Sequence, residues 1–115
     1  MATLIKKYNS AVLLSDLKIA DHLWSRLKGL LGTNSLDINQ GLWIHNCNSV
    51  HTFFMKYPID CIFLDSKLRV TRVITNIRPG RLVLPDWKSK SVVEANAGTA
   101  LSLNLQPGDE LDVGH

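Results

Sequence analysis

Along most of this chain, short segments rich in apolar residues are separated by polar turn residues. This pattern is typical of β-strands joined by turns. Proline and glycine mark turns at Pro79-Gly80 and Pro107-Gly108. Strands are predicted at Leu4 to Tyr8, Ala11 to Leu14, Gly41 to His45, Leu68 to Ile77, Leu82 to Leu84 and Ser91 to Ala95.

The stretch from Ile59 to Leu64 is apolar at nearly every position, apart from Asp60. Such a run predicts a central strand that is covered on both faces. In the next strand the alternation of apolar and polar residues changes parity at Arg72-Val73. An extra residue in the strand would cause this change, so we expect a β-bulge near Arg72.

One segment has a different period. Apolar residues recur at intervals of three and four, namely at Ala20, Leu23, Trp24, Leu27, Leu30 and Leu31. This spacing predicts an amphipathic helix. Ser15 or Asp16 could cap its start, and Gly32 stands where a helix would end. Together these elements predict a single α+β domain over residues 1–115. Its mainly antiparallel sheet should be strongly curved or barrel-like, with one N-terminal amphipathic helix.

Composition agrees with one compact domain. The chain is 45% hydrophobic and 20% charged, as in ordinary globular proteins, and it contains no apolar run of membrane-spanning length. The two cysteines are too few for a disulfide framework. We therefore expect a soluble cytoplasmic protein with reduced thiols and no membrane span.

The longest motif runs from Cys47 to Asp65 and reads CNSVHTFFMKYPIDCIFLD. With Gly41-Leu-Trp-Ile before it and Pro79-Gly-Arg81 after it, the motif resembles the small prokaryotic proteins grouped as domain of unknown function 192. That resemblance implies a small, mostly β fold with no established activity. The chain departs from the family pattern at Asn46, where a proline usually precedes the cysteine, and at Asn96-Ala97, where Leu-Pro is usual.

Nitrogen and sulfur ligands lie close together in this motif at His45, Cys47 and His51, with Cys61 further along. A soft metal could use such ligands, but the spacing differs from that of structural zinc sites, and Cys61 falls inside an apolar strand. We predict no metal and no cofactor. A second hypothesis is a hydrolase or thiol-dependent enzyme in which His51 activates Cys47.

Asp60 and Glu94 interrupt predicted apolar strands near their ends. A buried carboxylate must be hydrogen-bonded or paired, so Asp60 could tie down the turn from Met55 to Pro58, or pair with Arg81 or Arg26. Alternatively, both carboxylates and Arg81 could surround a pocket and perform acid-base chemistry if they face each other.

Basic residues dominate positions 66 to 90, where Asp86 is the one acid, whereas from residue 91 onward there are four acids and no lysine or arginine. This stretch could bind nucleic acid or another polyanion. We do not expect nucleic acid, because Trp87 alone would offer a stacking surface among the charges.

The sequence therefore favours a non-catalytic ligand-binding or accessory module, whose partner is an unknown small molecule or protein. Its expected site is the loop from residue 47 to 60 with two later residues. The candidate binding residues are Cys47, His51, Thr52, Met55, Asp60, Arg81 and Glu94.

Overall fold

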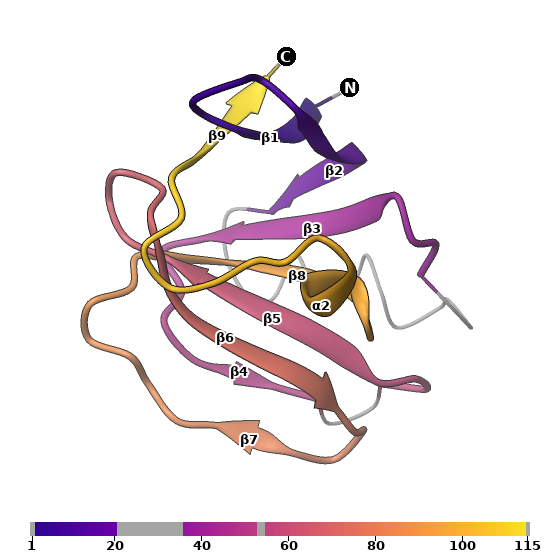
Figure 1. Cartoon of the computed structure of the whole chain (residues 1–115). Coiled ribbons are helices and arrows are strands. Elements are labelled where there is room, and N and C mark those ends of the chain that lie inside the picture. The colour runs from indigo at the N-terminus through magenta and orange to yellow at the C-terminus, as the bar shows by residue number, and fades with distance from the viewer. Residues whose placement is uncertain (1, 21–35, 53–54, 115) are drawn as a thin grey trace.

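The computed structural model describes residues 2–20, 36–52 and 55–114 (Figure 1). About half of these residues lie in strands. The elements are β1 (Ala2–Lys6), β2 (Val12–Ala20), β3 (Gln40–His45), β4 (Val50–His51), β5 (Ile59–Leu64), β6 (Val70–Ile77), β7 (Leu82–Val83), β8 (Ser91–Asn96), α2 (Thr99–Ser102) and β9 (Leu111–Gly114).

Seven of the strands form one twisted sheet in the order β6-β5-β8-β3-β2-β1-β9. All neighbours in it are antiparallel except β2 and β3, which are parallel. The short strands β4 and β7 pair with each other and form a second, two-stranded sheet. Figure 1 shows this second sheet lying against one side of the large sheet, whereas α2 lies against the other.

Two apolar clusters fill the space on the two faces of the large sheet. One contains Ile44, Phe63 and Val92 together with Val50 and Val83 from the small sheet. The other contains Ile62 and Val93 together with Ala100 of α2. Because side chains alternate between the faces of a strand, β5 and β8 supply both clusters.

The expected α+β class is wrong. Within the described residues the helical structure is the four-residue α2, and the rest of the regular structure is β. The barrel-like alternative is also wrong, because the sheet begins at β6 and ends at β9 without closing. An isolated bridge between Arg69 and Glu110 joins the two ends at one corner only. No helix in these ranges has the length and apolar character needed to cross a membrane.

The predicted N-terminal helix falls almost entirely on residues 21–35, which lie outside the described residues. Its expected start is wrong, because Ser15, Asp16 and Ala20 belong to the nine-residue strand β2. Buried positions in β2 recur every third residue, at Leu14, Leu17 and Ala20. Register shifts between β1 and β2 accompany this spacing, which imitates the period of a helix.

Two expectations about strands are confirmed. All six residues of β5 are buried, and β5 pairs with β6 on one edge and β8 on the other. The β5–β6 register changes between the pairs Phe63–Arg72 and Leu64–Val70, so the predicted bulge lies at Thr71-Arg72. A second register change lies between Ile59 and Cys61, opposite Asn76.

Candidate functional site

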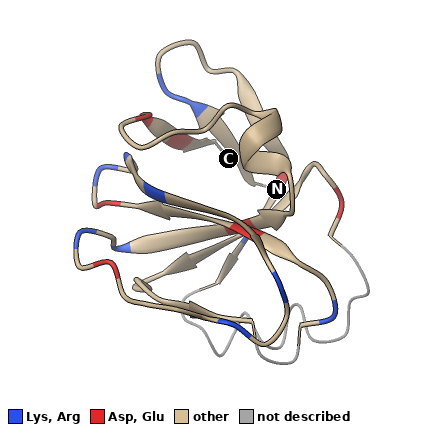
Figure 2. Cartoon of the chain, turned by 60° about the horizontal axis from the view of Figure 1, so that its bottom comes forward, with Lys and Arg blue, Asp and Glu red and all other residues tan. Residues whose placement is uncertain are grey.

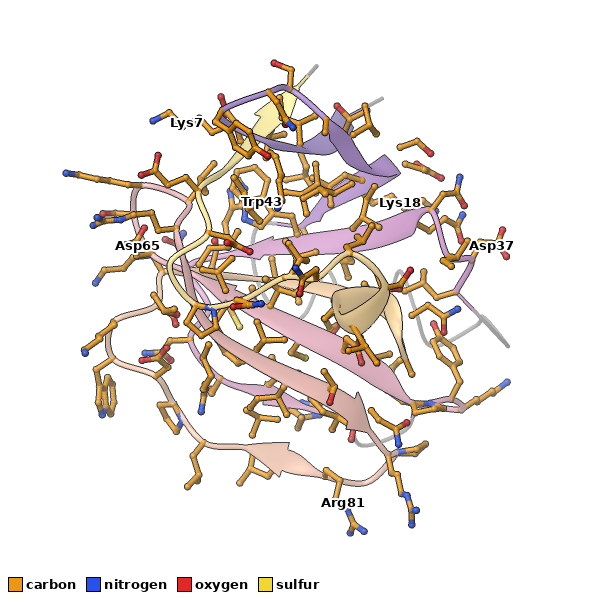
Figure 3. The ribbon with its side chains drawn as sticks, viewed as in Figure 1. Lys7, Lys18, Asp37, Trp43, Asp65 and Arg81 are labelled. Atoms are coloured by element: carbon orange, nitrogen blue, oxygen red, sulfur yellow. The ribbon has the colours of Figure 1, made fainter. Side chains whose placement is uncertain are left out.

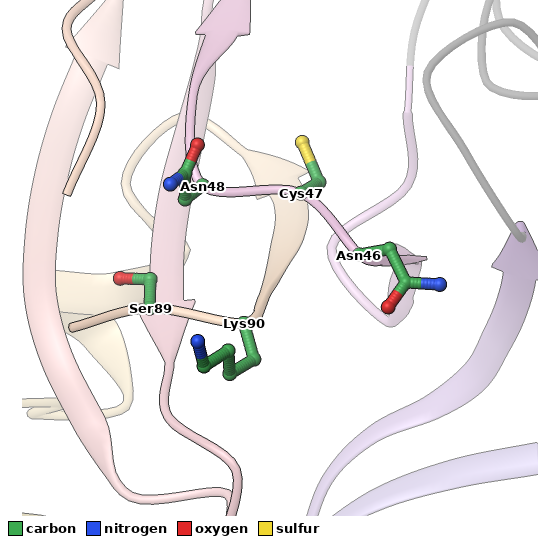
Figure 4. Close-up of a pocket in the computed structure, with 5 residues that line it drawn as sticks. All are labelled: Asn46, Cys47, Asn48, Ser89 and Lys90. Atoms are coloured by element: carbon green, nitrogen blue, oxygen red, sulfur yellow. The ribbon is translucent and has the colours of Figure 1, made fainter. Parts of the chain in front are cut away.

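A pocket of about 230 Å³ lies where the loop after β3 meets the segment that leads into β8. Asn46, Cys47, Asn48, Ser89 and Lys90 line it (Figure 4). Two backbone hydrogen bonds hold the walls together. The Cys47 N–H donates to the carbonyl of Lys90 over 3.1 Å, and the Asp86 N–H donates to the carbonyl of Asn48 over 2.9 Å.

The Cys47 side chain contributes little to this pocket. Its Sγ donates a hydrogen bond to the Ser49 carbonyl over 2.9 Å, and the side chain packs against the apolar cluster that also contains Phe63. Figure 4 shows the sulfur pointing away from Ser89 and Lys90. Cys47 therefore forms the pocket wall mainly through its backbone.

Asp86 fixes the Ser89 side of the pocket. Its Oδ2 accepts hydrogen bonds from the hydroxyl groups of Ser89 at 2.6 Å and Thr71 at 2.9 Å, and its Oδ1 accepts one from the Lys88 N–H at 3.2 Å. The Ser89 hydrogen bond is the main cause that lowers the pKa of Asp86. Desolvation opposes it, while Thr71, Lys88 and the positive charge of Arg72 add to it. The Asp86 carboxylate thus stays ionised and holds this wall in place.

Lys90 is held by its backbone and exposes its side chain. The Lys90 N–H donates to the Leu64 carbonyl over 2.8 Å. Nearby, Asp65 accepts hydrogen bonds from the backbone N–H groups of Lys67 and Arg69 and pairs with the Arg69 guanidinium at 3.1 Å. Desolvation raises the pKa of Asp65, but these interactions together outweigh it and lower the pKa. Neither Asp65 nor Asp86 uses the Lys90 ammonium in these hydrogen bonds, which leaves it available to an anion.

A second pocket of about 200 Å³ adjoins the first and shares Asn46 and Lys90 with it. We call the two pockets together the Asn46–Lys90 site. The remaining lining residues of the second pocket are Trp43, His45, Asp65, Ser66, Leu68 and Ser91. Ligand pockets for small molecules usually measure about 300–1,000 Å³, and each of the two pockets by itself is smaller than that.

Two ring nitrogens stand out in the second pocket. Trp43 and His45 make an edge-to-face contact, with their ring centroids 4.1 Å apart. Among the described residues, Trp43 Nε1 and His45 Nε2 are buried without a hydrogen-bond partner. Buried polar groups are nearly always satisfied by protein, water or ligand. Both nitrogens lie below the exposed surface of the pocket, so a ligand could reach them only after a local movement of the side chains.

Two sequence-predicted site residues, Thr52 and Arg81, are joined by hydrogen bonds to the Arg81 backbone. Thr52 is fully buried, and its Oγ1 donates to the Arg78 carbonyl at 2.6 Å and accepts from the Arg81 N–H at 2.8 Å. The Thr52 N–H also donates to the Arg81 carbonyl. The Arg81 side chain, by contrast, is exposed and points away from the body of the protein (Figure 3). Thr52 therefore holds the turn from Arg78 to Arg81.

Asp60 is fully buried and accepts three backbone hydrogen bonds. Its Oδ1 accepts from the N–H of Asn76 at 2.8 Å, and its Oδ2 accepts from those of Gly98 at 3.1 Å and Ala100 at 2.9 Å. Asn76 has a positive φ of 51° and lies at the second register change of β6. The carboxylate thus joins a bulge in β6 to the start of α2. Its hydrogen bonds are with neither the turn from Met55 to Pro58 nor Arg81.

Glu94 and Asp60 do not face each other. Glu94 is directly opposite Cys61 in the β5–β8 ladder, whereas Asp60 is opposite Ala95. Neighbouring residues of a strand point to opposite faces, so the two carboxylates lie on different sides of the large sheet. They cannot perform acid-base chemistry as a pair.

The other two candidate residues lie near the small sheet. Met55 is buried in the same apolar cluster as Val50 and Val83. His51 is half-buried in β4, opposite Leu82 of β7. Over the described ranges no group of three or more His, Cys, Asp or Glu side chains could hold a metal ion.

A family model described as an uncharacterized ACR, domain of unknown function 192 (DUF192), matches residues 4–113. The chain belongs to this family. A UPF0127 protein from Thermococcus sibiricus is 34% identical over 113 residues, which cover 95% of this chain and 73% of that protein. A UPF0127 protein from Pyrococcus horikoshii is 38% identical over 63 residues, 55% of this chain and 54% of that protein.

The DUF192 fold also occurs among solved structures. The crystal structure of a protein of unknown function from Novosphingobium aromaticivorans superposes with a TM-score of 0.77 at 23% identity, covering 96% of this chain and 82% of that one. The family has no known function, so these relatives establish the family and the fold and assign no ligand.

Asn46 gives this DUF192 chain a particular loop at the pocket. Asn46 has a φ of 50°, a left-handed conformation that asparagine tolerates. A proline, whose φ is locked near −65°, could not adopt this conformation. The loop that lines the Asn46–Lys90 site therefore depends on a residue that tolerates a positive φ at position 46.

Sequence reasoning found Cys47 but missed most of the pocket. Asn46 and Asn48 flank Cys47 in the sequence, and two polar amides on either side of a thiol were the available signal. Lys90 and Ser89 could not be connected with them, because hydrogen bonds between segments some 40 residues apart bring them together.

Proposed function

We propose that this chain is a non-catalytic binding module that holds a small molecule with a phosphate or carboxylate group at the Asn46–Lys90 site. The observation that carries the proposal is the set of polar side chains that line the two pockets of this site. Lys90 and Asn46 line both pockets, and Trp43 Nε1 and His45 Nε2 lie buried without a partner beside them. An oxyanion accepts hydrogen bonds from amide, indole and ammonium groups and is attracted by the lysine charge.

The remaining sequence-predicted residues take other parts in this proposal. Cys47 stays at the site through its backbone. Thr52 and Asp60 hold the loops and strands in place, and Met55 belongs to the core. His51, Arg81 and Glu94 are not among the residues that line the two pockets. The proposed site therefore shares Cys47 alone with the sequence-predicted set, and it lies at the start of the loop from residue 47 to 60.

The thiol-dependent alternative receives less support. A nucleophilic cysteine needs an accessible thiolate next to a base or a positive charge. The Cys47 thiol instead donates to a backbone carbonyl, packs on the core and points away from Lys90 (Figure 4). We therefore propose that the protein binds its small molecule without catalysing a reaction. As in the sequence-based prediction, we place it in the cytoplasm.

Binding of inorganic phosphate and acetate by isothermal titration calorimetry tests the proposal. We expect wild type to bind at least one of these anions and Lys90→Ala to lose about tenfold or more in affinity, because one charge-assisted hydrogen bond is worth roughly 1.5–3 kcal/mol. Lys88→Ala is the matched control, because Lys88 is an exposed lysine two residues away that does not line either pocket. Equal losses in both variants would point to a diffuse basic surface and would contradict a defined site.

A further inference from the structure

Three large apolar side chains stand exposed along β7 and the segment that joins it to β8. Leu82 is 64% exposed, Leu84 69% and Trp87 81%. Val83 between the two leucines is buried, at 7%. Since side chains alternate along an extended chain, Leu82 and Leu84 point outward on the same side. We call Leu82, Leu84 and Trp87 the apolar strip.

The segment is held firmly by polar contacts that do not involve the apolar strip's side chains. Arg72 donates to the Leu84 carbonyl at 2.8 Å, and Arg72 itself stacks over the Phe63 ring at 4.2 Å. Around Trp87, the Ser89 N–H donates to the Asp86 carbonyl at 2.9 Å, and the Asp86 side chain accepts from Lys88 and Ser89. Trp87 therefore stands at the tip of a well-anchored turn, and its exposure is built into the fold.

The surroundings of the apolar strip are positively charged. Arg78 and Arg81 are exposed in the loop before β7, and Lys88 and Lys90 are exposed in the connection after it. The single acid of this connection, Asp86, is engaged by Thr71 and Ser89. Figure 2 shows that Lys and Arg positions lie on several loops of the molecule, with acidic positions among them. A strip of leucine and tryptophan bordered by lysine and arginine is complementary to an anionic phospholipid surface, where tryptophan sits at the headgroup level and basic residues contact the headgroups.

We propose that this edge docks onto an anionic phospholipid surface, with the apolar strip entering the boundary between headgroups and acyl chains. A lipid surface fits better than a protein partner, because the strip projects from a turn and a strand edge and a fluid bilayer accommodates projecting side chains without a matching groove. The apolar strip is separate from the proposed anion site, because Leu82, Leu84 and Trp87 line neither of its pockets, and Lys90 is the one residue named in both.

Co-sedimentation of the full chain with vesicles tests this inference. Vesicles contain either phosphatidylcholine alone or phosphatidylcholine with about a third phosphatidylglycerol. We expect binding to the anionic vesicles that weakens as salt is raised, and a loss of at least about tenfold in partition coefficient for Trp87→Ser. Tyr8→Ser is the matched control, because Tyr8 is an aromatic residue with 83% exposure far from the strip in sequence, and it should bind like wild type.

Three results would overturn the inference. The first is no sedimentation with anionic vesicles at low salt. The second is binding that Trp87→Ser leaves unchanged, which would indicate charge alone. The third is a wild-type dimer in light scattering that Trp87→Ser converts to a monomer, which would assign the strip to a second copy of the chain. Both substituted side chains are exposed, so the variants should fold, and circular dichroism verifies this.

Discussion

Asp60 illustrates how far a single residue could be understood from the sequence. A lone acid in an apolar strand predicts a buried, hydrogen-bonded carboxylate, and this is what the structure has. The expected partners were wrong, because the three N–H donors come from residues 16, 38 and 40 positions away. Only the pairing of β5 with β6 and β8 brings those donors to Asp60, and no local pattern encodes that pairing.

Asp60→Asn should destabilise the protein by about 3 kcal/mol, because an amide offers one acceptor oxygen to three N–H donors and directs its own N–H groups at them. Chemical unfolding in urea measures the change. Asp37→Asn is the control, because Asp37 is exposed at the edge of the molecule (Figure 3). Similar stabilities for the two variants would show that the Asp60 hydrogen bonds contribute little.

A side chain at position 41 of β3, where the protein has glycine, should lower the stability of the fold. A Cβ at this position would lie 2.6 Å from Leu14 Cδ1 and 3.4 Å from Leu17 Cδ1, and Leu14 is fully buried. Gly41→Ala should therefore cost about 1–3 kcal/mol of unfolding free energy through overpacking. Leu14→Val in the same background should recover part of the loss in thermal denaturation. A Gly41→Ala protein as stable as wild type would mean that the apolar cluster around Leu14 and Leu17 adjusts easily at this point.

At the scale of elements, the strands were easier to predict than the helices. The continuous apolar run of β5 and the parity change in β6 are local signals, and both features exist. The pattern gave no sign of α2, because four residues complete about one turn and show no helical period. The register shifts of β2 space its buried residues like those of a helix, so the predicted helix began too early, at Ala20.

The turn from Asp86 to Ser89 supports both the Asn46–Lys90 site and the apolar strip, and it should depend on pH. Because folding lowers the pKa of Asp86 below its ordinary value of 3.8, the unfolded chain binds its proton more readily in acid. The stability that the carboxylate contributes is thus complete above the unfolded pKa and is lost as pH falls through the folded pKa.

Asp86→Asn should accordingly lower stability by about 1 kcal/mol near pH 7, because it weakens the hydrogen bonds from Ser89 and Thr71. The difference from wild type should shrink as the pH is lowered past 3.8. Urea unfolding at a series of pH values measures both effects. A difference that stays constant from pH 7 to acid would exclude the ionised carboxylate as its source.

At the scale of the whole molecule, the large sheet lies between two of the sequence-predicted residues. Asp60 and Glu94 are close in the β5–β8 ladder but serve opposite faces. The site that the structure offers lies instead at one end of the sheet, where the loop after β3 meets the segment before β8. The sequence could supply the candidate loop, whereas the lysine that completes the site came from the packing of distant segments.

The most direct test of the anion site follows the indole N–H signals of the tryptophans by nuclear magnetic resonance while inorganic phosphate is added. Trp43 Nε1 lies buried without a partner beside the site, whereas Trp87 is exposed and lines neither pocket. We predict a saturable shift of the Trp43 signal that is larger than any shift of the Trp87 signal and that Lys90→Ala abolishes. An unmoved Trp43 signal, or one that moves equally in Lys90→Ala, would contradict binding at the Asn46–Lys90 site.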